Sequence, residues 1–133
     1  MNIRLNMNTE NETQKRIQEI NTENIIIFIF LILIFLSLYA NQLEKNFFLK
    51  HSEADKEKYY YIQIFVFFIV VIVNIYYIYL SYQEVISLTP EDSPKKRKYA
   101  HLSLIASVSA LIAGLIILYI AITDTELDAE ITL

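Results

Sequence analysis

The sequence predicts an all-α integral membrane protein in which three transmembrane helices form a small bundle. Of the 133 residues, 55% are hydrophobic, and they gather in three long runs instead of alternating with polar residues. A helix in a soluble domain keeps a polar face, which these runs lack. No Asp, Glu, Lys or Arg interrupts them. Strands are a poor alternative, because backbone groups in lipid must all be paired and three strands cannot close a barrel.

The first predicted span covers residues 25–43. Residues 25–36 are all Ile, Leu or Phe, which favours insertion by roughly −4 to −7 kcal/mol. Residues 1–24 are polar and predict a flexible or marginally helical N-terminal tail. Asn24 is the residue type that caps helix N-termini, so we expect the first helix to begin there.

The second predicted span covers residues 59–82 and carries tyrosines at both ends. Tyr59, Tyr60 and Tyr61 precede its Phe-, Val- and Ile-rich centre, and Tyr76, Tyr77, Tyr79 and Tyr82 follow it. Tyrosine prefers the boundary between water and lipid. The helical rise from Tyr61 to Tyr79 is about 27 Å, close to the thickness of a hydrocarbon layer. Between the first two spans, the mixed charges of residues 51–58 are typical of a solvated helical extension.

The third predicted span covers residues 100–122. Ser93 followed by Pro94 is the pattern of an N-cap and a first helical position, so we expect the helix to begin in water. Thr89 to Asp92 repeats the pattern and predicts a short turn. Residues 124–133 form an acidic C-terminal tail.

Basic residues predict the orientation of the spans. The N-terminal tail and the loop before the third span share one side of the membrane, and the first loop lies on the other. The first side holds Arg4, Lys15, Arg16, Lys95, Lys96, Arg97 and Lys98, and the second holds Lys45, Lys50, Lys56 and Lys58. Lys and Arg favour the cytoplasmic side, which predicts a cytoplasmic N-terminus and an external C-terminus. The cluster from Lys95 to Lys98 also attracts anionic headgroups of the inner leaflet.

Two polar residues mark the spans themselves. Asn74 lies inside the second span, where its amide needs a hydrogen-bonding partner, and we expect it to face another helix. Structural contact is the simpler interpretation, and a place along a pore or in a ligand site is the alternative. His101, one residue into the third span, is expected to lie at the headgroup layer, with pH sensing as the alternative.

Small residues in the third span predict a helix-packing interface. Ala106, Ala110 and Gly114 are spaced by four residues, and Ser103 and Ser107 flank them. Small side chains permit close approach of a second helix in lipid. The partner is expected to be a helix of the same chain, with a second copy of the chain as the alternative.

The composition excludes several classes of chemistry. The chain has no Cys and one Gly, so disulfides, Cys-bound zinc and glycine-rich phosphate loops are excluded. His, Glu and Asp of residues 51–58 have no metal-ligand spacing. The titratable groups do not converge, and we expect no catalytic activity, no cofactor and no nucleic-acid partner. The abundance of Ile, Asn, Lys and Tyr is typical of AT-rich coding sequence and suggests a bacterium.

These observations favour a small non-enzymatic membrane protein, an accessory or self-associating subunit whose partners are the lipid bilayer and a second copy or another membrane protein. The alternative is a pore-forming or transport component. Size and span count resemble those of some phage holins, although the predicted ends point the other way and the C-terminal tail is acidic. In an oligomeric channel, Asn74, Ser107 and Ser109 would face a shared path.

Overall fold

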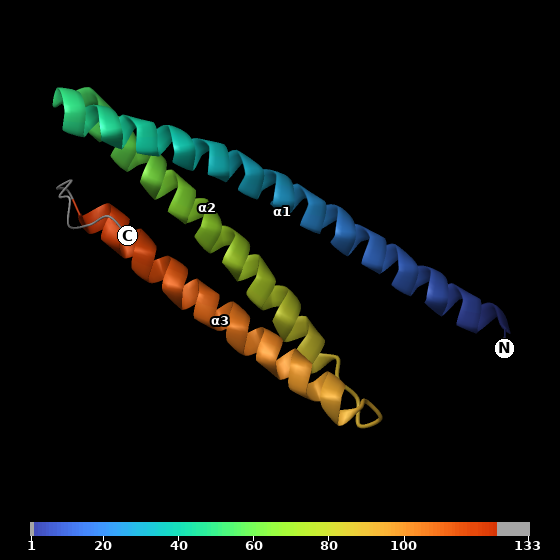
Figure 1. Cartoon of the computed structure of the whole chain (residues 1–133). Helices are drawn as coiled ribbons and strands as arrows, with labels where there is room; N and C mark the ends of the chain where they lie inside the picture. Colours follow the sequence, from blue (N-terminus) through green and yellow to red (C-terminus); the bar gives the residue numbers. More distant parts are fainter. Residues whose placement is uncertain (1, 125–133) are drawn as a thin grey trace. The chain divides into compact units, whose positions relative to one another are not determined.

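Three helices make up the part of the chain that the computed structural model describes, which is the backbone of residues 2–124 and the side chains of residues 9–124. They are α1 (Asn2–Lys50), α2 (Glu53–Ile86) and α3 (Pro94–Thr123), and Figure 1 labels each of them. No strand occurs between residues 2 and 124. All three helices are long and apolar enough to cross a membrane. The predicted all-α fold with three membrane-spanning helices is confirmed; of the predicted acidic tail, only Asp124 is among the described residues.

The chain divides into two units, Met1–Phe35 and Leu36–Leu133. In the first unit, α1 starts at Asn2, so the prediction that Asn24 caps the first helix is wrong. The polar segment is helical because a helix already formed by the apolar run is extended without a new nucleation step. Its side chains also bond within the helix: Arg16 pairs with Glu19 at 3.3 Å and with Glu23 at 3.6 Å.

The second unit begins with the end of α1 and a tight reversal into α2. His51 adopts a left-handed backbone conformation with φ of 53°, and its N–H donates to the Phe47 carbonyl at 2.8 Å. Ser52 then caps α2 by accepting from the Asp55 N–H at 3.4 Å. Because Lys56 Nζ lies 5.3 Å from the centre of the Phe47 ring, the start of α2 lies beside the end of α1.

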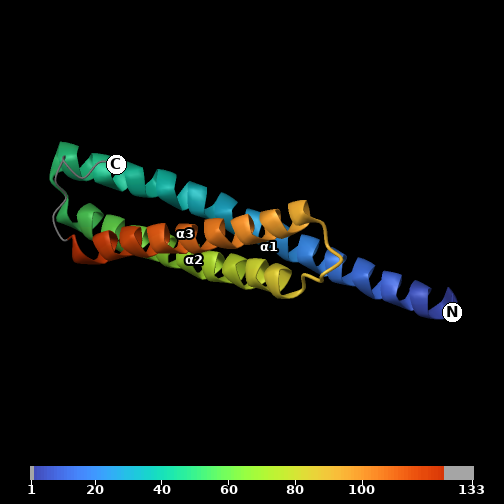
Figure 2. The ribbon, with the colours of Figure 1, turned by 90° about the horizontal axis from the view of Figure 1, so that it is seen from below.

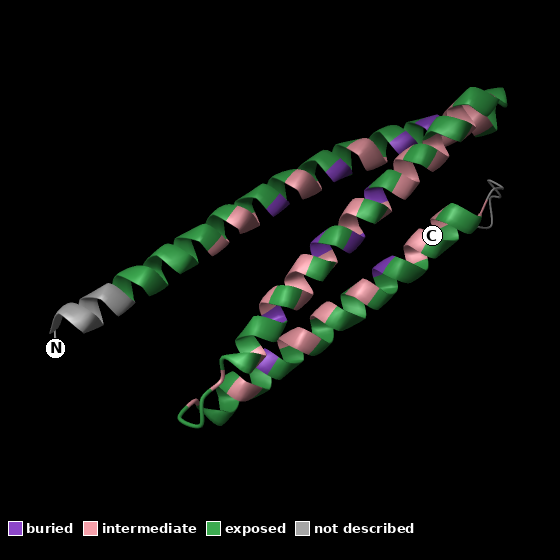
Figure 3. Cartoon of the chain, turned by 180° about the vertical axis from the view of Figure 1, so that it is seen from behind, coloured by how far each residue is buried: buried purple, intermediate pink, exposed green. Residues whose placement is uncertain are grey.

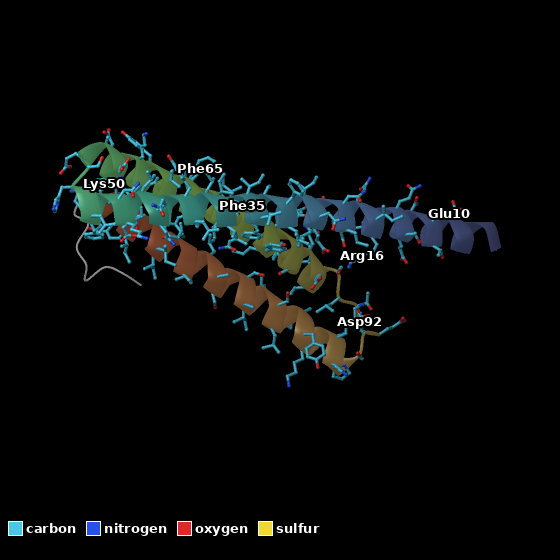
Figure 4. All side chains as sticks on the ribbon, turned by 45° about the horizontal axis from the view of Figure 1, so that its top comes forward. Glu10, Arg16, Phe35, Lys50, Phe65 and Asp92 are labelled. Atoms are coloured by element: carbon cyan, nitrogen blue, oxygen red, sulfur yellow. The ribbon has the colours of Figure 1, made fainter. Side chains whose placement is uncertain are left out.

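The loop between α2 and α3 follows the sequence prediction. Ser93 caps α3 by accepting from the Lys96 N–H at 3.1 Å, with Pro94 at the first helical position. The expected turn before it is present, since the Asp92 N–H donates to the Thr89 carbonyl at 3.1 Å and Asp92 Oδ2 accepts from the Thr89 N–H at 2.7 Å. Figure 2 shows this loop joining two helices that run side by side. Figure 4 labels Lys50 and Asp92, which flank α2 at its two ends.

Helices α2 and α3 pack against each other with a seven-residue repeat. Buried and half-buried residues recur along both helices (Figure 3). On α3 they include two interleaved series, first Leu104, Leu111 and Leu118, and second Ala100, Ser107, Gly114 and Ala121. On α2 the first matching series is Tyr60, Phe67, Asn74 and Ser81. The second is Ile64, Val71, Ile78 and Val85. A repeat of seven with two inward positions is the pattern of knobs-into-holes packing.

Candidate functional site

Three serines meet inside the contact between α2 and α3. Ser81 of α2 is the only buried polar side chain among the described residues. Its Oγ lies 2.9 Å from Ser107 Oγ and 3.2 Å from Ser103 Oγ, both on α3. Ser107 Oγ also donates to the Ser103 carbonyl at 2.9 Å. The two helices are therefore joined by hydroxyl groups at this level.

The number of hydroxyl protons fixes the direction of these hydrogen bonds. Each serine has one hydroxyl proton, and Ser107 uses its proton on the Ser103 carbonyl. The bond between Ser81 and Ser107 must then take its proton from Ser81. Ser81 is left as the acceptor of the Ser103 proton. All three protons are used, so the cluster offers no hydroxyl donor to a ligand while these bonds persist.

A second polar contact lies two helical turns away. Asn74 Nδ2 donates to the Ala110 carbonyl at 3.2 Å. Asn74 precedes Ser81 by seven residues, and Ala110 follows Ser103 by seven, as expected for antiparallel helices that keep one register. A rise of about 1.5 Å per residue separates the two levels by about 10 Å. Polar contacts at two levels fix how far α3 slides along α2.

Gly114 provides the space for the Asn74 amide. A Cβ atom at position 114 would lie 3.2 Å from Asn74 Nδ2 and 3.5 Å from Val71 Cγ2. The first of these distances is closer than ordinary contact, so the amide would have to move. Any movement of the amide disturbs its hydrogen bond to Ala110.

Only some residues of the predicted small-residue interface lie in the contact between α2 and α3. Ser103, Ser107 and Gly114 are buried or half-buried. Ala106 is exposed, and Ala110 has an exposed side chain although its carbonyl accepts from Asn74. The physical reason is geometric: a spacing of four residues turns about 40° further around the helix at each step, whereas a spacing of seven nearly returns to the same face.

Sequence reasoning missed Ser81 and the three leucines at the contact. Ser81 lies at the end of the second predicted span, close to water, where a polar residue gives no indication of a helix contact. The usable signal was the repeat itself. Leu104, Leu111 and Leu118 are each followed, three residues later, by a small residue (Ser107, Gly114 and Ala121).

Two side chains of the basic cluster at the start of α3 bond to residues of the preceding loop. Lys96 Nζ pairs with Asp92 Oδ1 at 3.0 Å, and Arg97 donates to the Thr89 carbonyl. Lys95 Nζ lies 5.8 Å from the centre of the Tyr99 ring. Hydrogen bonds from Thr89 and Lys96 hold the pKa of Asp92 below its ordinary value, because they stabilise the charged carboxylate. Lys95, Lys98 and the nearby His101 are exposed.

Comparisons with known proteins do not place the chain in a family. No protein-family model, curated protein or solved structure matches it. Within residues 9–124, no three His, Cys, Asp or Glu side chains lie close enough together to hold a metal ion. The geometry of the contact between α2 and α3 is therefore the basis for a functional proposal.

Proposed function

We propose that this chain is a non-enzymatic integral membrane protein that serves as an accessory or self-associating subunit of a membrane assembly. The observation that carries the proposal is the closed set of hydrogen bonds between α2 and α3. Ser81, Ser103 and Ser107 satisfy one another, and Asn74 donates to Ala110. Acid–base and nucleophilic chemistry needs convergent titratable groups, and this contact supplies hydroxyls and an amide.

The outward surfaces support a role in association. Large apolar side chains are exposed on all three helices, for example Phe35 at 63%, Phe65 at 52% and Ile116 at 55%. In a membrane these side chains meet lipid or another protein. The partners proposed are the lipid bilayer and either a second copy of the chain or another membrane protein.

The proposed orientation places the N-terminus in the cytoplasm and the C-terminus outside, in the cell membrane of a bacterium. It rests on the charge difference between the two sides. Replacing Lys95 and Lys98 by Gln removes two exposed charges while leaving the loop contacts of Lys96 and Arg97. Replacing all four cluster residues by Gln leaves three basic residues on the predicted cytoplasmic side against four on the other. A reporter enzyme fused after Leu133 should change from uniformly external to mixed in the fourfold variant, and a uniformly external signal contradicts the charge argument.

Association is tested by crosslinking in intact membranes. We expect a product that contains either two copies of this chain or one copy and a second membrane protein, identified by mass spectrometry. Lys50 and Lys58 provide amines for crosslinking at one end of α2. If only the uncrosslinked chain is recovered across reagent lengths while a known oligomer in the same membranes is captured, the subunit role is wrong.

A pore-forming or transport component, comparable with phage holins, is the second candidate. The exposed small residues of α3, Ala106, Ser109 and Ala110, favour it, because small residues allow copies of a helix to pack closely in lipid. The test is induced expression of this chain alone, followed by a voltage-sensitive dye. Loss of membrane potential and arrest of growth support the pore, and unchanged potential at equal expression supports the accessory role.

A further inference from the structure

A cavity of about 260 Å³ opens between the start of α2 and the end of α3. Glu57, Tyr60, Tyr61 and Ile64 of α2 line one side, and Ile122 and Asp124 at the end of α3 line the other. Ile64 and Ile122 continue the register that places Ser81 opposite Ser103 and Ser107. The cavity therefore occupies the end of the same helix contact that holds the serines.

The electrostatics of this cavity favour a cation. Two acidic residues, Glu57 and Asp124, are among the residues that line it. The last turn of α3 adds the partial negative charge of a helix C-terminus, and Asp124 caps that turn with its N–H on the Ile120 carbonyl at 2.8 Å. The nearest lysines on α2 flank Glu57 in sequence: Lys56 lies over the Phe47 ring of α1, and Lys58 is exposed.

The tyrosine rings indicate the chemical class of the ligand and its depth in the bilayer. Tyr60 and Tyr61 line the cavity, and the face of a tyrosine ring attracts ammonium groups. Both belong to the tyrosines expected at the boundary between water and lipid, which is the level of lipid headgroups. Ile64 lies one turn beyond Tyr60 on α2, and Ile122 precedes Asp124 by two residues on α3, so both lie further toward the apolar layer. A ligand with a cationic head and an apolar body fits this order of side chains.

The geometry points to a binding site for the ammonium group of a lipid headgroup, with phosphatidylethanolamine as the best match. Its primary ammonium has three N–H donors, which pair with the carboxylates of Glu57 and Asp124. The acyl chains then pass beside Ile64 and Ile122 into the bilayer. This site does not depend on the accessory role proposed above, since a pore-forming chain with the same cavity would bind the same headgroup.

The experiment uses the full chain purified in a non-ionic detergent, with bound lipid counted by native mass spectrometry. Short-chain phosphatidylethanolamine and phosphatidylglycerol are added at equal concentration. The test variant is Glu57→Gln with Asp124→Asn. The matched control is Glu53→Gln with Glu91→Gln, which removes the same charge from two exposed positions outside the cavity. Circular dichroism checks that each variant keeps its helix content.

We expect the ethanolamine lipid to be retained about five- to tenfold more than the glycerol lipid, the effect of two partly exposed charge contacts. The test variant should lose that preference and the control should keep it. Equal retention of the two lipids by the unaltered chain overturns the site, whatever the variants do. Competition by free ethanolamine at the concentration of the lipid assigns the site to a soluble amine and rejects the lipid. Displacement by millimolar Ca²⁺ alone, with no response to ethanolamine, rejects the ammonium.

Discussion

Replacing Ser81 by Ala should weaken the contact between α2 and α3 by about 1 kcal/mol. The change removes two hydrogen bonds between hydroxyls, one to Ser103 and one to Ser107. Hydrogen bonds between helices in membranes contribute about 0.6 kcal/mol each on average, which gives about 1.2 kcal/mol for the pair. In the variant, the Ser103 hydroxyl can donate to a carbonyl of its own helix, and Ser107 keeps its bond to the Ser103 carbonyl. The expected loss is therefore about 1 kcal/mol and not the full 1.2 kcal/mol.

The measurement is reversible unfolding in mixed micelles, followed by circular dichroism as the fraction of denaturing detergent rises. The control is Ser109→Ala, because Ser109 is an exposed serine of α3, the helix that carries Ser103 and Ser107. It should change the free energy of unfolding by less than about 0.5 kcal/mol. The double variant with Ser103→Ala should lose less than the sum of the single losses, because the two residues share one bond. Equal effects of Ser81→Ala and Ser109→Ala would refute the hydroxyl assignment.

Three further predictions concern the helix contact and its loop. Gly114→Ile should lower stability in detergent by more than Gly114→Ala, because even a Cβ already meets Asn74 Nδ2 at 3.2 Å and a branched side chain adds further overlap; equal melting temperatures contradict close packing here. Ser93→Ala should cost about 1 kcal/mol through loss of the N-cap, measured by the same unfolding assay, and Ser93→Asp should restore it. The pKa of Asp92 is lowered in the folded chain. The Asp92 carboxylate therefore stabilises the folded loop above about pH 4, and this stabilisation is lost as the pH falls through the pKa of the folded state. Limited proteolysis of the loop should therefore become faster as the pH falls below about 4. The Asp92→Asn variant should be cleaved at a rate that does not depend on pH over the same interval.

Much of the fold follows from local features of the sequence. The apolar runs dictate helices because lipid leaves backbone groups no other partners. Ser93 and Pro94 mark the start of α3 because a cap and a fixed φ act within a few residues. Asn24 shows the limit of such local reasoning. A capping residue is used only where the chain stops being helical, and upstream of Asn24 the helix continues through Arg16 and its acidic partners.

The site was harder to predict than the spans because it depends on which faces of two helices meet. Asn74 is conspicuous in an apolar run, and the structure gives it a carbonyl of the next helix. Ala106 and Gly114 look equivalent as small residues, yet one is exposed and the other buried. Ser81 gives no local signal, since its role arises from residues more than twenty positions away.

The polar start of α1 has a mechanical consequence. Residues 2–24 continue the same helix as the apolar run that follows them, so they form a rod of about 34 Å outside the apolar layer. Salt at physiological strength screens charges over about 8 Å. Thr9 lies sixteen residues before Ile25, about 24 Å along the helix, which is about three times this screening length. Where this segment points away from the bilayer, we expect side chains near Thr9 to be screened from the charge of the lipid headgroups.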